Sequence, residues 1–402
     1  MDIKRGGMMK LLFAIVLLIE SIVSYGQTSG DYRTSVSGIV DWSNVANWEI
    51  YNGTTWEAAT EYPGQNVAAG EVVISNNTLM TVDLSIPNSI SSLVIAGDDN
   101  NTSVVFGGAY SLTVVGHIAF AAPSSNSVTN LFDLGTGILN CSSVEMTSTS
   151  DNSRVQSFTI SSGELNVSNS FTMSTPTQNV LNVTGPATIR IGDTFTMVST
   201  VTLNSASTVE FNGPDPQVIS SVTGGYGNIV LNGTGSKTLQ SAITIKGNLT
   251  VGTNVAFNDG GFVMSGTSGI FSLASGAVYT TTRTASPWFP TNLTPNIDAN
   301  STVVFSANAS FTLPSSVMSY GTLVLNGTGT KTLSTAITIN KDLTISLGTL
   351  ADGGYQITGN PTGVLSLSNG TGLTLGSATS ATTFPSLFVA GNIILGSTST
   401  VT

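Results

Sequence analysis

The sequence predicts an all-β protein built as a parallel β-helix, a solenoid with about 25 residues per turn. Three observations favour this fold: a long internal repeat, a shorter pattern of alternating apolar residues within it, and a composition unsuited to helices. Charged residues make up only 8% of the 402 positions, so Lys and Glu, which usually cover helix surfaces, are scarce. The repeat and the composition therefore point to the same fold class.

The charge and hydrophobicity of the chain exclude two classes of protein. There are 22 acidic and only 11 basic residues, giving a formal net charge of -11, which would repel the phosphates of a nucleic acid. Disordered chains are poor in apolar residues and rich in charge, whereas here 40% of residues are hydrophobic. We therefore expect a folded protein that does not bind nucleic acid.

Residues 1–26 have the layout of a secretory signal peptide. Basic residues precede an unbroken apolar run at 11–19, and the small residues Ser24 and Gly26 stand at the -3 and -1 places of a cut before Gln27. A membrane anchor is the alternative, but the run is short for a bilayer, and no later run is long enough to span one. The sequence predicts export by a secretion machinery, a secreted or extracellular location with attachment to the cell surface, and no membrane span after signal removal.

A long repeat organises the second half of the chain. The stretch 226–250 returns at 320–344, an offset of 94 residues, with 17 of 25 positions identical. The similarity continues on both sides, so we assign one copy to 207–300 and a second to 301–398. Residues 399–402 resemble the start of a third copy, which predicts that the chain is a fragment of a longer protein.

A shorter pattern, apolar-x-apolar-x-x-x-apolar-x-apolar, occurs within the copies of the long repeat and also in residues 101–206. Its period of two places alternate side chains on one face of a strand, and the polar or glycine-bearing triplet between its halves suits a corner. The pattern occurs at Leu112/Val114/Ile118/Phe120, Leu165/Val167/Phe171/Met173, Ile189/Ile191/Phe195/Met197, Ile243/Ile245/Leu249/Val251, Ile337/Ile339/Leu343/Ile345 and Leu387/Val389/Ile393/Leu395, with a shorter version at Leu139/Cys141/Val144/Met146. Short strands, corners and a nearly constant turn length predict stacked turns that share one core.

Tandem β-sandwich modules are the main alternative architecture, because immunoglobulin-like domains also have about 100 residues. A β-propeller is a further alternative. The register of about 25 residues inside each copy favours the solenoid, since a Greek-key module has strands of unequal roles.

Residues 27–100 differ from the rest of the chain and are rich in aromatic residues, including three of the four tryptophans. We expect them to form a cap, because the open edge of a solenoid's first turn would otherwise invite aggregation.

The same region carries a family resemblance. The segments 30–33 (GDYR), 41–48 (DWSNVANW), 51–56 (YNGTTW) and 62–64 (YPG) resemble the N-terminus of large secreted bacterial repeat proteins exported by the type IX secretion route. They also look like a divergent G8-type domain. The resemblance covers roughly residues 30 to 120 and implies an extracellular, adhesin-like β-solenoid with a C-terminal sorting domain.

Few residues suggest catalysis. His117 is the only histidine and falls in a corner, where we expect it to face solvent, and Cys141 should point into the core. No serine or cysteine triad can be assembled without a second histidine or a reactive cysteine. Glu145, Glu164 and Asp193 could form a carboxylate cluster of the kind polysaccharide-cleaving β-helices need, but they fall in different registers.

The candidate binding residues are aromatic or acidic. Tryptophan rings can stack on sugars, which makes Trp288 with Phe289, and also Trp42, Trp48 and Trp56, candidate carbohydrate contacts. A role in the cap is the alternative for the last three.

Asp98 and Asp99 form a weak candidate calcium site, although a run of Asp and Asn after a glycine is more often a turn. We expect no cofactor.

These observations predict a secreted or cell-surface structural and adhesion protein, an extended stalk whose partners are glycans or other surface molecules. The alternative is the non-catalytic, carbohydrate-binding part of a larger extracellular enzyme.

Overall fold

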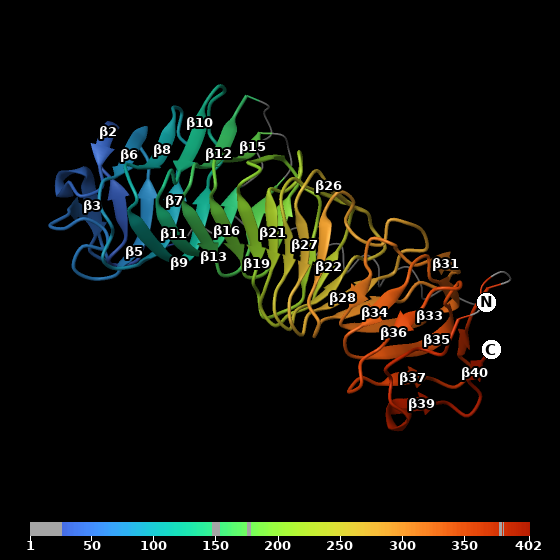
Figure 1. Ribbon diagram of the computed structural model, residues 1–402. Helices are drawn as coiled ribbons and strands as arrows, with labels where there is room; N and C mark the ends of the chain where they lie inside the picture. Colours follow the sequence, from blue (N-terminus) through green and yellow to red (C-terminus); the bar gives the residue numbers. More distant parts are fainter. Residues whose placement is uncertain (1–25, 147–152, 175–177, 378–379, 381) are drawn as a thin grey trace, which may run out of the picture.

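The computed structural model describes residues 26–146, 153–174, 178–377, 380 and 382–402. The predicted signal segment therefore lies outside the described residues, apart from Gly26. The protein is nearly all β, with 2% helix, and its strands stack into a β-solenoid of about 13 turns. Figure 1 shows an elongated rod whose turns follow one another along its long axis. The predicted parallel β-helix is confirmed.

The strands form three large sheets and two small ones, which run along the rod. A 16-stranded sheet contains β1 (Tyr32–Thr34), β3 (Trp48–Tyr51), β4 (Trp56–Ala58), β5 (Ala69–Ile74), β7 (Ile90–Ile95), β9 (Ser111–Phe120), β11 (Ile138–Met146), β13 (Glu164–Val167), β14 (Phe171–Met173), β16 (Thr188–Ile191), β17 (Phe195–Met197), β19 (Thr208–Phe211), β21 (Asn228–Leu231), β24 (Leu249–Val251), β27 (Ile270–Leu273) and β29 (Thr294–Ile297). A seven-stranded sheet contains β2 (Gly38–Asp41), β6 (Thr78–Val82), β8 (Thr102–Phe106), β10 (Thr129–Asp133), β12 (Val155–Ile160), β15 (Asn179–Val183) and β18 (Thr200–Leu203).

The remaining strands belong to the second half of the rod. A 12-stranded sheet contains β20 (Gln217–Ile219), β22 (Lys237–Leu239), β25 (Ala256–Asn258), β28 (Val278–Thr281), β30 (Thr302–Phe305), β31 (Phe311–Thr312), β33 (Thr322–Thr332), β35 (Leu343–Ala351), β37 (Leu365–Leu367), β38 (Gly372–Thr374), β39 (Ile393–Leu395) and β40 (Thr400–Val401). The small sheets are β23 (Ile243–Ile245) with β26 (Met264–Gly266), and β32 (Ser319–Tyr320) with β34 (Ile337–Ile339) and β36 (Ile357–Thr358). Two 3-10 turns, η1 (Val45–Asn47) and η2 (Ala390–Asn392), complete the described elements.

The core of the rod is built from rows of like side chains. Alternation along each strand points every second residue inward, and parallel pairing in register places each inward residue on its counterpart in the next turn. One such row consists of Leu112, Leu139, Leu165, Ile189, Val209 and Ile229, each at most 1% exposed. A second row is aromatic, and Phe132 stacks on Phe158 with ring centroids 4.8 Å apart. Stacking neighbours therefore supply the hydrophobic burial that no turn achieves alone.

The turns are less uniform than the sequence predicted. In the 16-stranded sheet Leu112 pairs with Leu139, which makes a turn longer than the predicted length, whereas Val209 pairs with Ile229, which makes a shorter one. The last turn, from Leu365 to Ile393, is again long. The predicted turn length thus falls between these extremes, and no single length describes the rod.

The long repeat does not correspond to a whole number of turns. Four turns take the chain from Val209 in β19 to Pro295 in β29 of the same sheet, a stretch shorter than one repeat. Val303, which matches Val209 in the repeat, lies further on, in β30 of the 12-stranded sheet. Val209 and its counterpart Val303 therefore lie in different sheets.

The N-terminal aromatic residues form a cap, but it is shorter than the predicted 27–100, because β5 and β7 already pair in parallel as turns of the solenoid. Trp42 and Trp48 are fully buried, with ring centroids 5.0 Å apart, and their indole nitrogens donate to the backbone oxygens of Pro63 and Trp42. Strands β3 and β4 extend the edge beside β1 through antiparallel pairs, whereas every other pairing among the described strands is parallel. The rings close the end of the core and the hairpin covers the edge of the first turn.

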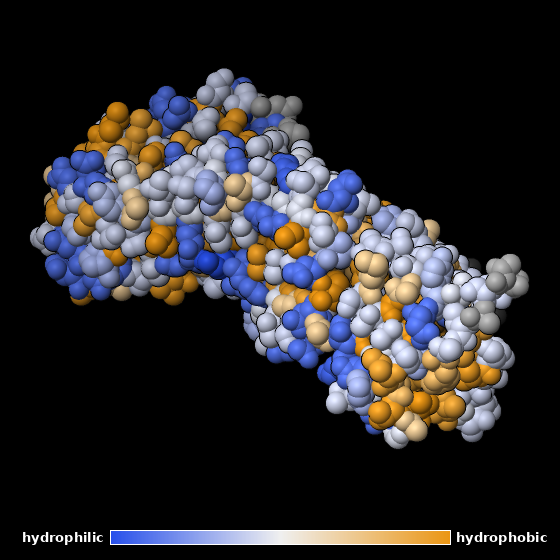
Figure 2. Space-filling model, viewed as in Figure 1, coloured by the Kyte–Doolittle hydropathy of each residue, from blue (hydrophilic) through white to orange (hydrophobic). Residues whose placement is uncertain are grey.

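The opposite end of the rod is apolar on its surface. Figure 2 shows orange atoms gathered at this end, over the region of β37 and β39. Leu387, Val389, Ile394 and Leu395 are between 45% and 57% exposed. The apolar pattern predicted for this last position does not form two strands, because Leu387 adopts a left-handed backbone conformation and Val389 leads into η2.

Residues shared by the two copies have structural roles inside the turns. Lys237 and Lys331 are fully buried, and their Nζ atoms donate to backbone oxygens, that of Gly213 for Lys237 and those of Ala307 and Gly327 for Lys331. Burial of the ammonium group lowers the pKa of Lys237 to about 8 and also lowers that of Lys331. The repeated lysines thus hold the corners of their turns.

The Asp-Gly-Gly segments at equivalent positions of the two copies, 259–261 and 352–354, are turns. Asp259 and Asp352 are buried, and each Oδ1 accepts a hydrogen bond from the backbone nitrogen two residues later. Both glycines after Asp259 have positive φ, at 58° and 81°, a conformation that other residues rarely adopt.

Candidate functional site

The outer surface of the 16-stranded sheet carries a row of polar side chains. Thr113, Asn140, Asn166, Arg190 and Glu210 are register partners on five successive strands, β9, β11, β13, β16 and β19. They alternate with the inward-facing core residues, so the strand period turns all five outward. Parallel stacking thus converts residues one turn apart in the sequence into neighbours along the rod.

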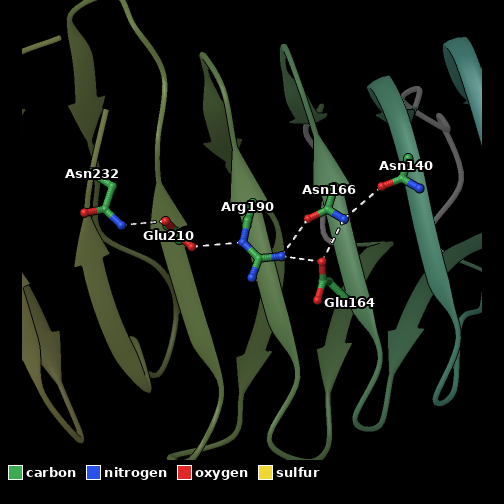
Figure 3. Close-up of polar contacts among 6 residues, drawn as sticks. All are labelled: Asn140, Glu164, Asn166, Arg190, Glu210 and Asn232. Atoms are coloured by element: carbon green, nitrogen blue, oxygen red, sulfur yellow. Dashed lines mark hydrogen bonds and ion pairs between the residues drawn. The ribbon is translucent and has the colours of Figure 1, made fainter. Parts of the chain in front are cut away.

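Hydrogen bonds and ion pairs join this row into a network, shown in Figure 3. Arg190 is its centre: Nε donates to Glu210 at 3.0 Å, and Nη1 donates to Asn166 at 2.9 Å and also to Glu164. Asn166 in turn donates to Asn140 and to Glu164, both at 2.9 Å. The network therefore holds the guanidinium plane and the amide groups in fixed orientations.

A further amide extends the network by one turn. Asn232, directly after β21, donates to the second carboxylate oxygen of Glu210 at 2.7 Å. In the described part of the chain, Nη2 of Arg190 donates no hydrogen bond, so the outer edge of the guanidinium remains available for one.

The electrostatics favour ionised carboxylates. The hydrogen bond from Asn166, followed by the charge and hydrogen bond of Arg190, lowers the pKa of Glu164. A general acid at neutral pH needs the opposite shift, so Glu164 is suited to accepting hydrogen bonds rather than to donating a proton. One guanidinium faces two carboxylates, so the three groups together carry a negative charge.

An open groove of about 530 Å³ runs beside this network, along the sheet. We call it the Asn/Arg groove, and its polar lining consists of Thr113, Asn140, Ser142, Asn166, Ser168, Arg190 and Asn212. The lining offers amide, hydroxyl and guanidinium groups from five successive turns, a length of roughly 19 Å at a strand spacing of about 4.8 Å. Such a surface can form many directional hydrogen bonds with an elongated ligand.

Glu145, Glu164 and Asp193 do not form a carboxylate cluster, as their different registers in the sequence indicated. Glu145 lies on the second half of β11, opposite Ala119 and Thr172, whereas Glu164 lies opposite Ile138. Asp193 lies in the turn after β16. Glu164 instead shares Arg190 with Glu210, a residue that the sequence analysis did not single out.

The structure does not support Trp42 and Trp48 as carbohydrate contacts. They are 0% and 1% exposed, and stacking on a sugar requires an open ring face. Trp56 is half-buried at the outer edge of the cap, where the guanidinium of Arg33 lies 4.5 Å from its ring centroid. It borders a cavity of about 270 Å³.

Trp288 and Phe289 also lie mostly inside the protein, each 6% exposed. Trp288 packs edge-on against Phe311 at 4.8 Å, and both predicted residues line a cavity of about 310 Å³. The Trp288 indole nitrogen is buried without a hydrogen-bond partner among the described residues. These two residues therefore form the wall of a small cavity rather than an exposed aromatic platform.

The acidic pair Asp98 and Asp99 is engaged in turn contacts. Asp98 accepts from the backbone nitrogen of Asn77 at 3.2 Å, and Asp99 accepts from the hydroxyls of Ser124 and Ser125, which lower its pKa. Within the described ranges no group of three or more His, Cys, Asp or Glu residues is arranged to hold a metal ion.

Cys141 and His117 occupy different environments. Cys141 is 5% exposed in the core, and burial raises the pKa of its thiol to about 12, which makes it unreactive near neutral pH. His117 is half-buried in β9 rather than fully solvent-facing, and it lines a cavity of about 260 Å³ with Glu71 and Ser92.

Comparisons with known protein families, with curated proteins and with solved structures found no match. The fold is therefore established from the structure alone: the chain is a β-helical repeat protein. In the described residues, no helix has the length and apolar character needed to cross a bilayer.

Asn140, Asn166, Arg190 and Asn212 were not among the site residues predicted from the sequence. The outward register of Asn140, Asn166 and Arg190 could have been read from the alternation, since each is flanked by two apolar residues. The alignment of Asn140, Asn166 and Arg190 also follows from the apolar pattern, because each stands between two inward residues at equivalent pattern positions. Asn212 lies outside that pattern, and only the structure places it beside the other three.

Proposed function

We propose that this protein is a secreted or cell-surface β-solenoid that acts as an extended stalk and an adhesive contact surface. The observation that carries the proposal is the continuous stack of about 13 parallel turns around one core, a length of roughly 60 Å at a strand spacing of about 4.8 Å. A rod of this kind separates its two ends and presents long, regular faces, which suits extension and contact.

Two features of the sequence support an extracellular setting. Residues 1–26 have the layout of a secretory signal, and 30–64 resemble the start of adhesin-like repeat proteins of the type IX secretion route with a G8-like segment. The surface is rich in uncharged polar groups, with charged residues only 8% of the chain. Hydroxyls and amides favour hydrogen bonding with glycans or other surface molecules over binding of polyanions.

Export is tested by expressing the complete chain in a bacterium with an intact secretion route and locating the product. Mass spectrometry of surface and culture fractions should find a mature N-terminus at Gln27. Accumulation of the uncut chain in the cytoplasm would contradict the proposal.

Adhesion is tested with beads that carry the purified protein, under flow over surfaces coated with glycans, with cells or with the protein itself. We expect the coated beads to be retained on at least one of these surfaces and beads coated with albumin to pass. Absence of retention on all three surfaces would reduce the function to that of a passive spacer.

The second candidate function is the non-catalytic, carbohydrate-binding part of a larger extracellular enzyme. The Asn/Arg groove favours this alternative, since its amides and hydroxyls suit sugar hydroxyls. A reading frame that continues into a carboxylate-rich domain would support the enzyme, whereas further repeats and a sorting tail would support the adhesin.

A further inference from the structure

We infer that the Asn/Arg groove binds a neutral, extended polysaccharide whose chain lies along the axis of the solenoid. The inference rests on the proposed function, because it names the ligand of one contact surface. It depends on three properties of the groove: its direction and period, its hydrogen-bonding groups and its charge.

The direction of the groove suits a linear polymer. Its lining residues Thr113, Asn140, Asn166 and Arg190 follow one another on adjacent strands, so a polar side chain recurs at every turn. Parallel strands are spaced about 4.8 Å apart, close to the rise of one sugar in an extended glycan. Each successive sugar can therefore meet a polar side chain of a successive turn.

The groups of the groove suit hydroxyls as partners. Amides and hydroxyls both donate and accept hydrogen bonds and a guanidinium donates them, so the lining can satisfy a sugar hydroxyl in either role. The network holds these groups before any ligand arrives, since Asn166 bonds to Arg190 at 2.9 Å and to Asn140 at 2.9 Å. Such preorganisation lowers the conformational entropy lost on binding.

The charge of the groove selects against acidic polysaccharides. Arg190 is the only cation among the lining residues, and it is already paired with Glu164 and Glu210. The surplus carboxylate would repel a uronic acid, whereas uncharged sugars meet no such cost. At one side, Val115 is 65% exposed and offers apolar area to the carbon-bound face of a sugar ring.

The test measures binding of the purified protein to cellohexaose and xylohexaose, which are neutral, and to hexagalacturonate, which is acidic, by titration calorimetry. We expect at least one neutral hexasaccharide to bind, more tightly than its trisaccharide and more tightly than hexagalacturonate. Absence of neutral binding, or tighter binding of hexagalacturonate, would overturn the inference.

Two variants place the binding in the groove. Asn166→Ala removes hydrogen bonds and should weaken the affinity about tenfold, whereas Ser142→Trp fills the groove and should abolish binding. The matched controls are Ser272→Ala and Thr250→Trp, which stand on the same outer face outside the groove and should change the affinity less than twofold. Thermal unfolding of all four variants shows whether they remain folded.

Unchanged binding in a folded Ser142→Trp variant would refute this location. Bead adhesion distinguishes the two proposals. If the wild-type protein binds no neutral glycan and beads carrying Ser142→Trp still adhere, the inference fails and the adhesive function stands. If wild-type beads adhere to no surface while cellohexaose or xylohexaose binds in the groove, adhesion fails and the inference stands.

Discussion

The buried lysine of the first repeat copy should make the stability of the protein depend on pH in a defined direction. Lys237 is 0% exposed, its Nζ donates to the backbone oxygen of Gly213 at 3.0 Å, and it forms no ion pair among the described residues. Burial lowers its pKa from 10.5 to about 8. Below pH 8 the lysine is charged in the folded and the unfolded chain, so the full cost of burying the charge is present there.

Between the folded and unfolded pKa values, the unfolded chain binds more protons than the folded one, so the free energy of unfolding rises with pH. Between pH 8 and pH 9.5 this linkage should increase the free energy of unfolding by about 1.5 kcal/mol. Tyr226, Tyr279 and Tyr320 have raised pKa values, which acts in the opposite direction near and above pH 10. The measurement therefore ends at pH 9.5 and compares variants.

The variant is Lys237→Gln, because Gln217 occupies the same register position in the preceding turn and is buried there. Urea unfolding at pH 8.0 and 9.5 should show the gain of about 1.5 kcal/mol in the wild type relative to this variant. Lys341→Met, which removes the same charge from an exposed position, is the control. Equal pH dependence in wild type and Lys237→Gln would refute the reasoning.

Three further predictions concern the core, the turn length and the thiol. Ile229→Ala should lower the free energy of unfolding by about 3 kcal/mol because Ile229 is 1% exposed, whereas Val230→Ala, on the outer face of the same strand, should lower it by less than about 1 kcal/mol in urea unfolding. Deletion of 228–247, which is one whole turn, should leave cooperative thermal unfolding intact. Deletion of 228–237 should abolish cooperative unfolding, because it moves the later strands to the wrong face of the rod. Equal melting of the two deletion variants would contradict the observed strand register. Cys141 should resist alkylation by iodoacetamide at pH 8 in the folded protein and react rapidly in urea, and rapid labelling of the folded protein would show that the thiol is accessible.

The local pattern of the sequence was enough to predict the fold. Alternation at Leu165/Val167 and Ile189/Ile191 identified strands and their inward faces, because the period of two is a property of the extended backbone itself. The cap was predicted from the crowding of aromatic residues, and the tryptophans Trp42 and Trp48 close the core as expected.

The candidate site was not predicted, because ordinary polar residues between apolar ones carry no functional signal of their own. The apolar pattern aligns Asn140, Asn166 and Arg190, but only the structure shows the hydrogen bonds that join them into a network. Tryptophans were the stronger candidates in the sequence, but Trp42 and Trp48 lie in the core because large apolar rings gain most from burial.

From its sequence alone, this chain could be recognised as a β-solenoid with an N-terminal cap, because alternation and repetition are local properties. The tertiary structure decided which residues share a face. The turns contain different numbers of residues, so the repeat length is not a whole number of turns. Val209 and its repeat counterpart Val303 therefore lie in different sheets. The same stacking brings Glu164, Arg190 and Glu210 together across three turns. The reason is physical. A strand's position around the rod depends on the summed lengths of all the turns before it, and only the packing of the core determines where each turn closes.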